Sequence, residues 1–234
     1  MKNKNILWLY LFLFAGILDI VFTANGEFST RVFTKPLIVI ALWGFFIVSS
    51  KDIKGTILRK TISAALVFSW LGDVLLMFPD LFLYGLGAFL MAHICYIIGF
   101  KIAQTNPFAI GTVNFLKLFL VNLPIYIAAA FVYFLINPGL GATKIPVVIY
   151  LIVIVMMVTT ARERFGKTNA VSFWQVFIGG MFFMVSDGIM AINKFYNPFP
   201  ESGVIVMGTY IIAQFLIVRG ILAHLDSVAK ISPT

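Results

Sequence analysis

The sequence predicts an all-α integral membrane protein, folded as one polytopic bundle of eight transmembrane helices that spans residues 1–234. Hydrophobic residues make up 61% of the chain and charged residues only 11%, and the mean hydropathy is +1.03. A soluble protein of this length does not need so much apolar surface. The apolar residues also gather into runs close to the roughly 20 residues that cross a bilayer as a helix.

Short polar or turn-forming segments separate the apolar runs. The expected helices cover Ile6–Thr23, Val32–Ser49, Thr61–Phe78, Leu81–Ala103, Asn114–Ile136, Thr143–Ala161, Val171–Ile192 and Gly203–Leu225. The clearest breaks are Pro79-Asp80, Asn137-Pro138-Gly139 and Asn197-Pro198. The first run contains Asp19 and lacks a clear small-residue cleavage site, so we interpret it as a retained helix rather than a signal peptide.

The basic residues predict the orientation. With eight spans both termini lie on one side, and that side receives Lys2, Lys4, Lys51, Lys54, Arg59, Lys60, Lys101, Lys117, Arg162, Arg164, Lys167 and Lys230. The other side receives only Arg31, Lys35, Lys144 and Lys194. Because cytoplasmic loops are enriched in Lys and Arg, we expect both termini in the cytoplasm. The expected location is the plasma membrane, which is the inner membrane if the source is a Gram-negative bacterium.

Two aspartates lie inside predicted spans. Asp73 ends Phe68-Ser69-Trp70-Leu71-Gly72-Asp73 in the third span, and Asp187 ends Phe182-Phe183-Met184-Val185-Ser186-Asp187 in the seventh. A charged side chain at a helix centre costs at least about 2.5–3.5 kcal/mol, so each needs a structural or functional reason. At 1.5 Å per residue they lie ~18 Å and ~24 Å from the cytoplasmic helix ends, in the outer half of the bilayer. We expect Asp73 and Asp187 to face one cavity there as an acid/base pair.

The two halves of the chain, about 1–110 and 111–234, resemble each other. Thr34-Lys35-Pro36 opens the second span as Thr143-Lys144-Ile145-Pro146 opens the sixth. Gly87 and Ala92-His93 of the fourth span correspond to Gly208 and Ala213-Gln214 of the eighth. The first and fifth spans show no convincing match. The pattern predicts a four-plus-four repeat whose copies share one orientation, with equivalent sites meeting at their interface.

Four further polar residues are candidate substrate-binding groups. Lys35 and Asp19 lie at the outer ends of their spans, where Lys35 is an interfacial anchor, a cation for a lipid phosphate or a partner for an aspartate. Tyr210 and Gln214 are one helical turn apart, so both can face a substrate or a carboxylate. The alternative for Tyr210, Gln214 and the aspartates Asp73 and Asp187 is hydrogen bonding between helices that holds the bundle together. Asp19 lies near a helix end, where a solvated carboxylate costs little, so it need not belong to a site.

His93 and Ser186 complete the candidate substrate-binding residues. Ser186 adjoins Asp187, and His93 lies well inside the fourth span. Since catalytic zinc usually has three protein ligands, a single histidine among scattered carboxylates predicts hydrogen bonding and no metal site. The lone Cys95 supports neither a disulfide nor a metal cluster.

Several function classes lose support. The chain has no Gly-x-Ser-x-Gly elbow and no phosphate-binding glycine loop, which argues against serine-esterase and nucleotide-dependent mechanisms. The net charge of +8 comes from short loops between apolar runs and does not indicate nucleic-acid binding. We expect no cofactor, and the sequence leaves the oligomeric state open.

An ordered set of residues resembles the YhhN family over most of the chain. The set comprises Lys35-Pro36, Gly72-Asp73, Gly87 with His93 and Tyr96, Gly179-Gly180 through Ser186-Asp187, and Tyr210 with Gln214. The family usually has Gly-Ala where this chain has Gly179-Gly180. The resemblance implies a lysoplasmalogenase, which hydrolyses the vinyl ether of a lysoplasmalogen to a fatty aldehyde and glycerophosphoethanolamine or glycerophosphocholine. It also implies that Asp73 and Asp187 are the essential carboxylates.

The implied chemistry suits two carboxyl groups. Vinyl ethers open after a proton adds to the alkene carbon, which leaves an oxocarbenium ion that water attacks. Glycosidases meet a related oxocarbenium ion with two carboxyl groups. Intramembrane carboxylates and a repeat also suit a proton-coupled transporter of lipids or small molecules, which is the alternative function. A purely structural membrane partner explains the matched polar positions least well.

Overall fold

The protein forms eight long α-helices in a computed structural model that describes residues 2–53, 55–105 and 115–231. They are α1 (Lys2–Ala24), α2 (Phe28–Ser49), α3 (Ile57–Leu75), α4 (Phe82–Ile102), α5 (Phe115–Ile136), α6 (Lys144–Arg162), α7 (Ala170–Phe195) and α8 (Ser202–Ile231). Only short 3₁₀ turns accompany them, and the described residues contain no strand. The all-α prediction is confirmed, and all eight expected segments coincide with these helices to within a few residues.

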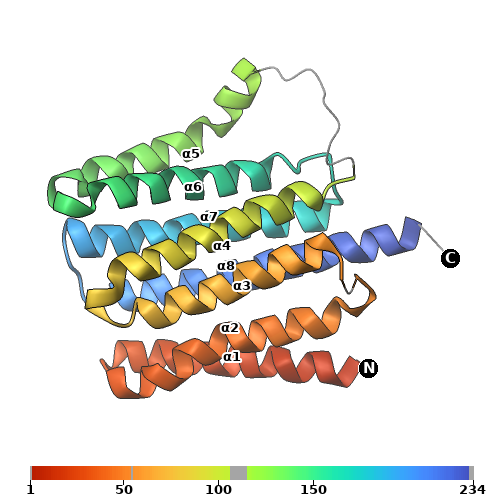
Figure 1. Ribbon diagram of the computed structural model, residues 1–234, viewed down its shortest axis with the longest axis horizontal. Helices are drawn as coiled ribbons and strands as arrows, with labels where there is room; N and C mark the ends of the chain where they lie inside the picture. Colours follow the sequence, from red (N-terminus) through yellow and green to blue (C-terminus); the bar gives the residue numbers. More distant parts are fainter. Residues whose placement is uncertain (1, 54, 106–114, 232–234) are drawn as a thin grey trace.

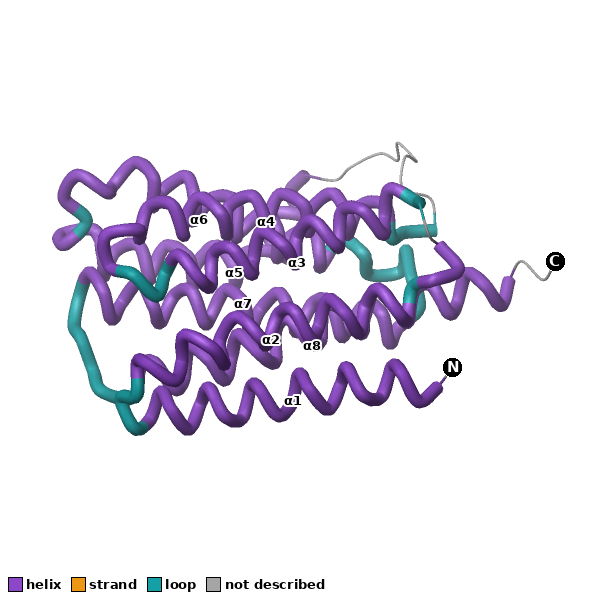
Figure 2. The backbone as a smooth tube through the Cα atoms, turned by 60° about the horizontal axis from the view of Figure 1, so that its bottom comes forward, coloured by secondary structure: helices purple, strands orange, loops and turns teal. Residues whose placement is uncertain are grey.

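The helices lie side by side and alternate in direction (Figure 1). The start of α1 and the end of α8 therefore lie at the same end of the bundle, which we call the terminal end; the opposite end is the distal end. Turns at the terminal end join α2 to α3 and α6 to α7, while the α1–α2, α3–α4, α5–α6 and α7–α8 connections lie at the distal end (Figure 2). Which end of the bundle faces the cytoplasm stays a prediction.

Seven of the eight helices are long and apolar enough to cross a membrane. The exception is α3, whose 19 residues include Arg59 and Lys60 in the first turn and Asp73 near the end. It nevertheless packs along α4 and against α2, with Ile62 and Leu66 fully buried. Seven spans are confirmed by length and composition, and the crossing of the membrane by α3 stays a prediction.

Glycines let the last two helices approach closely. A Cβ atom on Gly179 of α7 would lie 2.9 Å from the backbone oxygen of Ala213 in α8. A Cβ atom on Gly220 of α8 would lie 2.9 Å from the backbone nitrogen of Val176 in α7. Contacts of this kind are typical of membrane helices. Inside a membrane the hydrophobic effect does not drive helices together, and small residues at the interface let the backbones pack closely. They fix the position of α8, which carries Tyr210 and Gln214 into the site described below.

Arg164 joins three helices at the terminal end. Its guanidinium is fully buried and donates to the backbone oxygen of Ala103, at the end of α4, at 3.1 and 3.2 Å. It also donates to the backbone oxygen and the hydroxyl of Ser172, in the first turn of α7, at 3.3 and 2.7 Å. Burial lowers the pKa of Arg164 to about 10, which leaves it charged at neutral pH. These bonds hold the α6–α7 turn against α4.

Replacing Arg164 by methionine is expected to lower stability. The substitution keeps much of the buried volume but leaves the acceptors of Ala103 and Ser172 without their donor. The expected loss is at least about 1.5–3 kcal/mol, the usual contribution of a hydrogen bond to a charged group. Thermal unfolding in detergent measures it, with Lys167→Met as the control because that exposed lysine lies on the same turn. Equal melting temperatures for the two variants would rule out an anchoring role.

Candidate active site

Asp73 lies near the end of α3 and is almost completely buried. The Tyr210 hydroxyl of α8 donates to its Oδ2 atom at 2.7 Å. Lys35 of α2 places its ammonium nitrogen 3.9 Å from Oδ1. Burial of a carboxylate is costly without a partner, and here one hydrogen bond and one ion pair offset that cost. The sequence-predicted residues Lys35, Asp73 and Tyr210 therefore meet, although they come from three helices.

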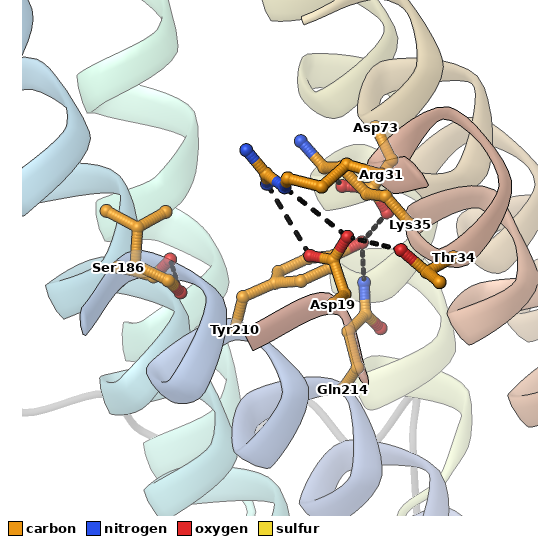
Figure 3. A network of polar contacts seen from close by, with 9 residues as sticks. Asp19, Arg31, Thr34, Lys35, Asp73, Ser186, Tyr210 and Gln214 are labelled. Atoms are coloured by element: carbon orange, nitrogen blue, oxygen red, sulfur yellow. Dashed lines mark hydrogen bonds and ion pairs between the residues drawn. The ribbon is translucent and has the colours of Figure 1, made fainter. Parts of the chain in front are cut away.

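A second ion pair adjoins this group. Asp19 of α1 is fully buried and accepts a hydrogen bond from the Thr34 hydroxyl at 2.9 Å. The guanidinium of Arg31 lies 3.4 and 3.5 Å from its two carboxylate oxygens. Figure 3 shows Asp19, Arg31 and Thr34 next to Lys35 and Asp73. Two cations and two carboxylates thus gather where α1 and α2 meet α3, about seven residues or fewer from the distal helix ends.

A relay of side chains orients Tyr210. The Gln214 amide, one turn along α8, donates to the Tyr210 hydroxyl at 3.1 Å. The Tyr96 hydroxyl of α4 in turn donates to the Gln214 side-chain oxygen at 2.5 Å. Because its oxygen accepts from Gln214, the Tyr210 hydroxyl is left to donate to Asp73. All three side chains are buried, so the relay is shielded from water.

Asp187 of α7 has a separate set of partners. The Tyr150 hydroxyl of α6 donates to its Oδ2 atom at 2.5 Å, and the Nε2 atom of His93 lies 3.9 Å from the same oxygen. Asp187 also lines a cavity of about 50 Å³ between α5, α6 and α7. The rest of that cavity is apolar apart from Tyr150. The carboxyl group of Asp187 is therefore presented to a small apolar chamber.

His93 is fully buried among aromatic rings. Its ring centroid lies 4.7 Å from that of Phe183 and 5.3 Å from that of Tyr150. Neither ring nitrogen has a hydrogen-bond partner among the described residues. Buried imidazoles normally have partners, and the nearest carboxylate oxygen to the His93 ring is Asp187 Oδ2, 3.9 Å from Nε2. In the described part of the chain, no group of three His, Cys, Asp or Glu side chains is arranged to hold a metal ion.

Aromatic rings connect the two aspartate groups. Phe183 lies with its centroid 5.4 Å from that of Tyr210 and 4.7 Å from that of His93. Tyr210 donates to Asp73 and His93 lies beside Asp187, so these rings connect the surroundings of the two carboxyl groups. The cavity at Asp187 is not lined by Asp73, so this space is not the shared cavity that the sequence predicts. The arrangement is one site with two poles, an ionic pole at Asp73 and an apolar pole at Asp187.

Ser186 stands apart from both poles. Its hydroxyl donates to the backbone oxygen of Val206 at 2.9 Å and so joins α7 to α8 (Figure 3). The sequence interpretation missed three site residues: Arg31, Thr34 and Tyr150. Arg31 and Lys35 are four residues apart on one helical face, a signal that was available. Tyr150 carried no such signal, because it is one of eight tyrosines in an apolar chain.

Comparison with known proteins gives this arrangement a context. The sequence profile of the YhhN family matches residues 30–221, which include every site residue described above except Asp19. This chain belongs to the YhhN family. No solved structure is significantly similar to it.

Several curated proteins similar to this chain are named as enzymes. The chain is 29% identical over 183 residues to lysoplasmalogenase TMEM86B of Homo sapiens, a match that covers 78% of this chain and 71% of the human protein. It is 30% identical over 190 residues to lysoplasmalogenase TMEM86A of Bos taurus, covering 78% of this chain and 74% of the bovine protein. It is also 30% identical over 166 residues to a lysoplasmalogenase of Mycobacterium bovis, covering 69% of this chain and 60% of the mycobacterial protein.

Proposed function

We propose that this protein is a membrane-embedded lysoplasmalogenase. It adds water to the vinyl ether of a lysoplasmalogen and releases a fatty aldehyde together with glycerophosphoethanolamine or glycerophosphocholine. The observation that carries the proposal is Asp187, a carboxyl group held by Tyr150 at an apolar chamber inside the bundle. The names of the mammalian and mycobacterial relatives support the same reaction.

Asp187 is the proposed general acid. A buried carboxyl group without a cation beside it is less costly to hold as the neutral acid, and Asp187 has only a tyrosine hydroxyl and an imidazole as described polar neighbours. The neutral acid transfers its proton to the alkene carbon that is not bonded to oxygen. The positive charge then develops on the carbon that is bonded to the ether oxygen.

Asp73 is the proposed electrostatic partner. Lys35 lies beside Asp73, which offsets the cost of burying Asp73 as a carboxylate. The proposed role of the Asp73 carboxylate is to stabilise the oxocarbenium ion, and such electrostatic stabilisation is often the largest contribution to catalysis. Water adds to the cation and returns a proton to Asp187. The resulting hemiacetal collapses to the aldehyde and the glycerol hydroxyl, so one water is consumed and the acid is restored.

The ionic pole is the proposed head-group site. Arg31 and Lys35 keep 22% and 12% of their side chains exposed, unlike the fully buried carboxylate of Asp19. A lipid phosphate that approaches from the distal end would meet these two cations first. Tyr210 and Gln214 hold Asp73 in position through their hydrogen bonds and contribute to substrate binding indirectly.

The four-plus-four repeat and the orientation are part of the same proposal. Helix packing supports the repeat, because α3 packs on α4 as α7 packs on α8, and α2 meets α8 as α6 meets α4. Each aspartate also has a neighbour on the fourth helix of the other half, Tyr210 for Asp73 and His93 for Asp187. Two repeats related by a two-fold axis along the membrane normal would place each aspartate against the fourth helix of the other repeat in this way. With the termini cytoplasmic, both poles lie toward the outer surface.

Labelling of single cysteines tests the orientation. Cys95→Ala removes the one cysteine of the chain, and a new cysteine is placed at Asn197, distal, or at Asp52, terminal. Both positions are exposed. A membrane-impermeant maleimide added to intact cells is expected to label Asn197→Cys and to spare Asp52→Cys until the membrane is opened. The opposite pattern would reverse the proposed orientation.

Turnover by purified protein tests the function. Incubation in detergent with 1-alkenyl-glycerophosphoethanolamine and with the choline lipid is expected to release fatty aldehyde in equal amount to the glycerophospho product. The saturated 1-alkyl lipid is the control, because it lacks the alkene carbon that must accept the proton. Binding of the alkenyl lipid without aldehyde release would overturn the proposal.

A further inference from the structure

A groove between α5 and α6 adjoins the cavity at Asp187. It has a volume of about 350 Å³, in the range of ligand pockets, and opens to the outside of the bundle. Its lining is Tyr126, Ala129, Ala130, Tyr133, Val148, Leu151, Ile152, Val155 and Met156. Ala129 and Leu151 line both this groove and the cavity at Asp187, so the two spaces share a wall.

The groove lies at the distance from the distal end that the chain of a bound lysolipid would reach. Asp187 lies eight residues from the distal end of α7, a distance of about 12 Å. On α6 the groove runs from Val148 to Met156, which lie about 6 and 18 Å from the distal end of that helix. A lipid whose vinyl ether reaches Asp187 and whose head group faces the distal end sends its chain deeper. The groove continues in that direction.

Three other apolar grooves fit less well. The groove between α5 and α7 shares Val132, Met184 and Gly188 with the Asp187 cavity, but its volume of about 180 Å³ is about half that of the α5–α6 groove. On α7 it also extends to Ile192, on the distal side of Asp187.

The groove of about 300 Å³ between α4 and α6 is lined on α6 only by Ile145–Tyr150, within about 9 Å of the distal end. It therefore lies on the side of Asp187 that the polar head group must occupy. The groove of about 340 Å³ between α2 and α3 is lined by Val67 and Trp70 among others and shares no residue with the Asp187 cavity.

The position of α5 explains why a groove forms here. This helix lies at the edge of the bundle and packs against α6 and α7, and its N-terminal part diverges from α6 (Figure 1). Pro124 inside α5 removes a backbone donor, as prolines at helix bends do. Ala129 and Ala130 then present only methyl groups to α6, and space for a chain remains. Because membrane lipid is as apolar as this lining, the hydrophobic effect does not favour moving the chain from the lipid into the groove. The groove therefore acts by holding the chain in one position.

We propose that the α5–α6 groove binds the alkenyl chain of the lysolipid and sets the chain length that the enzyme accepts. This inference rests on the proposed function. The single hydrocarbon chain enters sideways from the bilayer between α5 and α6, and its ether end stops at Asp187. A fixed depth for the chain places the alkene carbon against the acid.

Filling the groove tests this inference. Ala130 is exposed at the groove, so Ala130→Phe adds a ring there without entering the core. With a series of 1-alkenyl lipids, this variant is expected to lose about tenfold or more in kcat/KM for long chains relative to short ones. Val67→Phe is the matched control, since it fills the α2–α3 groove, and Gly87→Phe fills the α4–α6 groove. Both are expected to keep the wild-type chain-length profile.

The outcomes separate the two proposals. An unchanged profile in active Ala130→Phe protein, or a shift caused by Gly87→Phe instead, would overturn the groove assignment and leave the function standing. A wild-type protein that releases no aldehyde at any chain length overturns the function itself. Photocrosslinking of wild-type protein by a lysolipid with a diazirine near its chain end needs no variant. It is expected to modify residues 126–133 or 148–156, and modification confined to α2 and α3 would refute the proposal.

Discussion

Asparagine in place of Asp187 is expected to reduce aldehyde release about 10²–10⁴-fold, the usual contribution of a general acid. The amide keeps the size of the carboxyl group and can still accept a hydrogen bond from Tyr150. It has no proton acidic enough to transfer to carbon. Because the chemical step is lost and binding is not, kcat is expected to fall while KM changes little. Product release from 1-alkenyl lipid in detergent measures both constants.

Asp80→Asn is the matched control for this variant. Asp80 is exposed in the distal turn between α3 and α4, so its substitution changes the same charge outside the site. The control is expected to retain wild-type turnover. Size-exclusion behaviour and melting temperature must agree among the three proteins. A folded Asp187→Asn protein with near-normal turnover would remove Asp187 from the mechanism.

Tyr150→Phe separates positioning from proton transfer. It removes the hydroxyl that orients Asp187 but leaves the acid in place. A loss of turnover smaller than that of Asp187→Asn is therefore expected. Tyr150 also lines the chamber, and the phenylalanine ring keeps that wall. Turnover as low as in Asp187→Asn would mean that the phenol takes part in the proton transfer.

The helices were predictable from the sequence because each depends on local signals. Apolar runs of membrane-spanning length and breaks such as Asn137–Gly139 are sufficient to place them. The contacts of Lys35 with Asp73 were only partly predictable. The residue types and their depth indicated a shared polar region, since a charged group inside a membrane needs a partner. Which cation meets which carboxylate depends on how helices pack.

No local pattern in the sequence predicted that the site would divide into two poles. A membrane helix is apolar on nearly every face, so periodicity does not show which face meets a neighbour. Packing depends instead on small residues such as Gly179, whose close contact with α8 sets where Tyr210 lies. The placement of Phe183 between Tyr210 and His93 follows from that packing. Two aspartates at matching positions therefore need not share one cavity.

Removal of the Lys35 ammonium is expected to destabilise the protein strongly. Lys35→Met keeps the length of the side chain but leaves the buried Asp73 carboxylate without its cation. Loss of one partner from a buried ion pair typically costs about 3–5 kcal/mol. Thermal unfolding in detergent measures the effect. Lys144→Met is the matched control, because Lys144 opens the sixth span as Lys35 opens the second but is exposed.

The double variant decides whether Lys35 acts through Asp73. Lys35→Met with Asp73→Asn removes both charges, so most of the lost stability is expected to return because no unpaired charge stays buried. Activity is not expected to return, since the proposed mechanism needs the Asp73 carboxylate near the oxocarbenium ion. Recovery of aldehyde release along with stability would show that the ion pair only holds helices together. A double variant no more stable than Lys35→Met would mean that the two side chains do not interact.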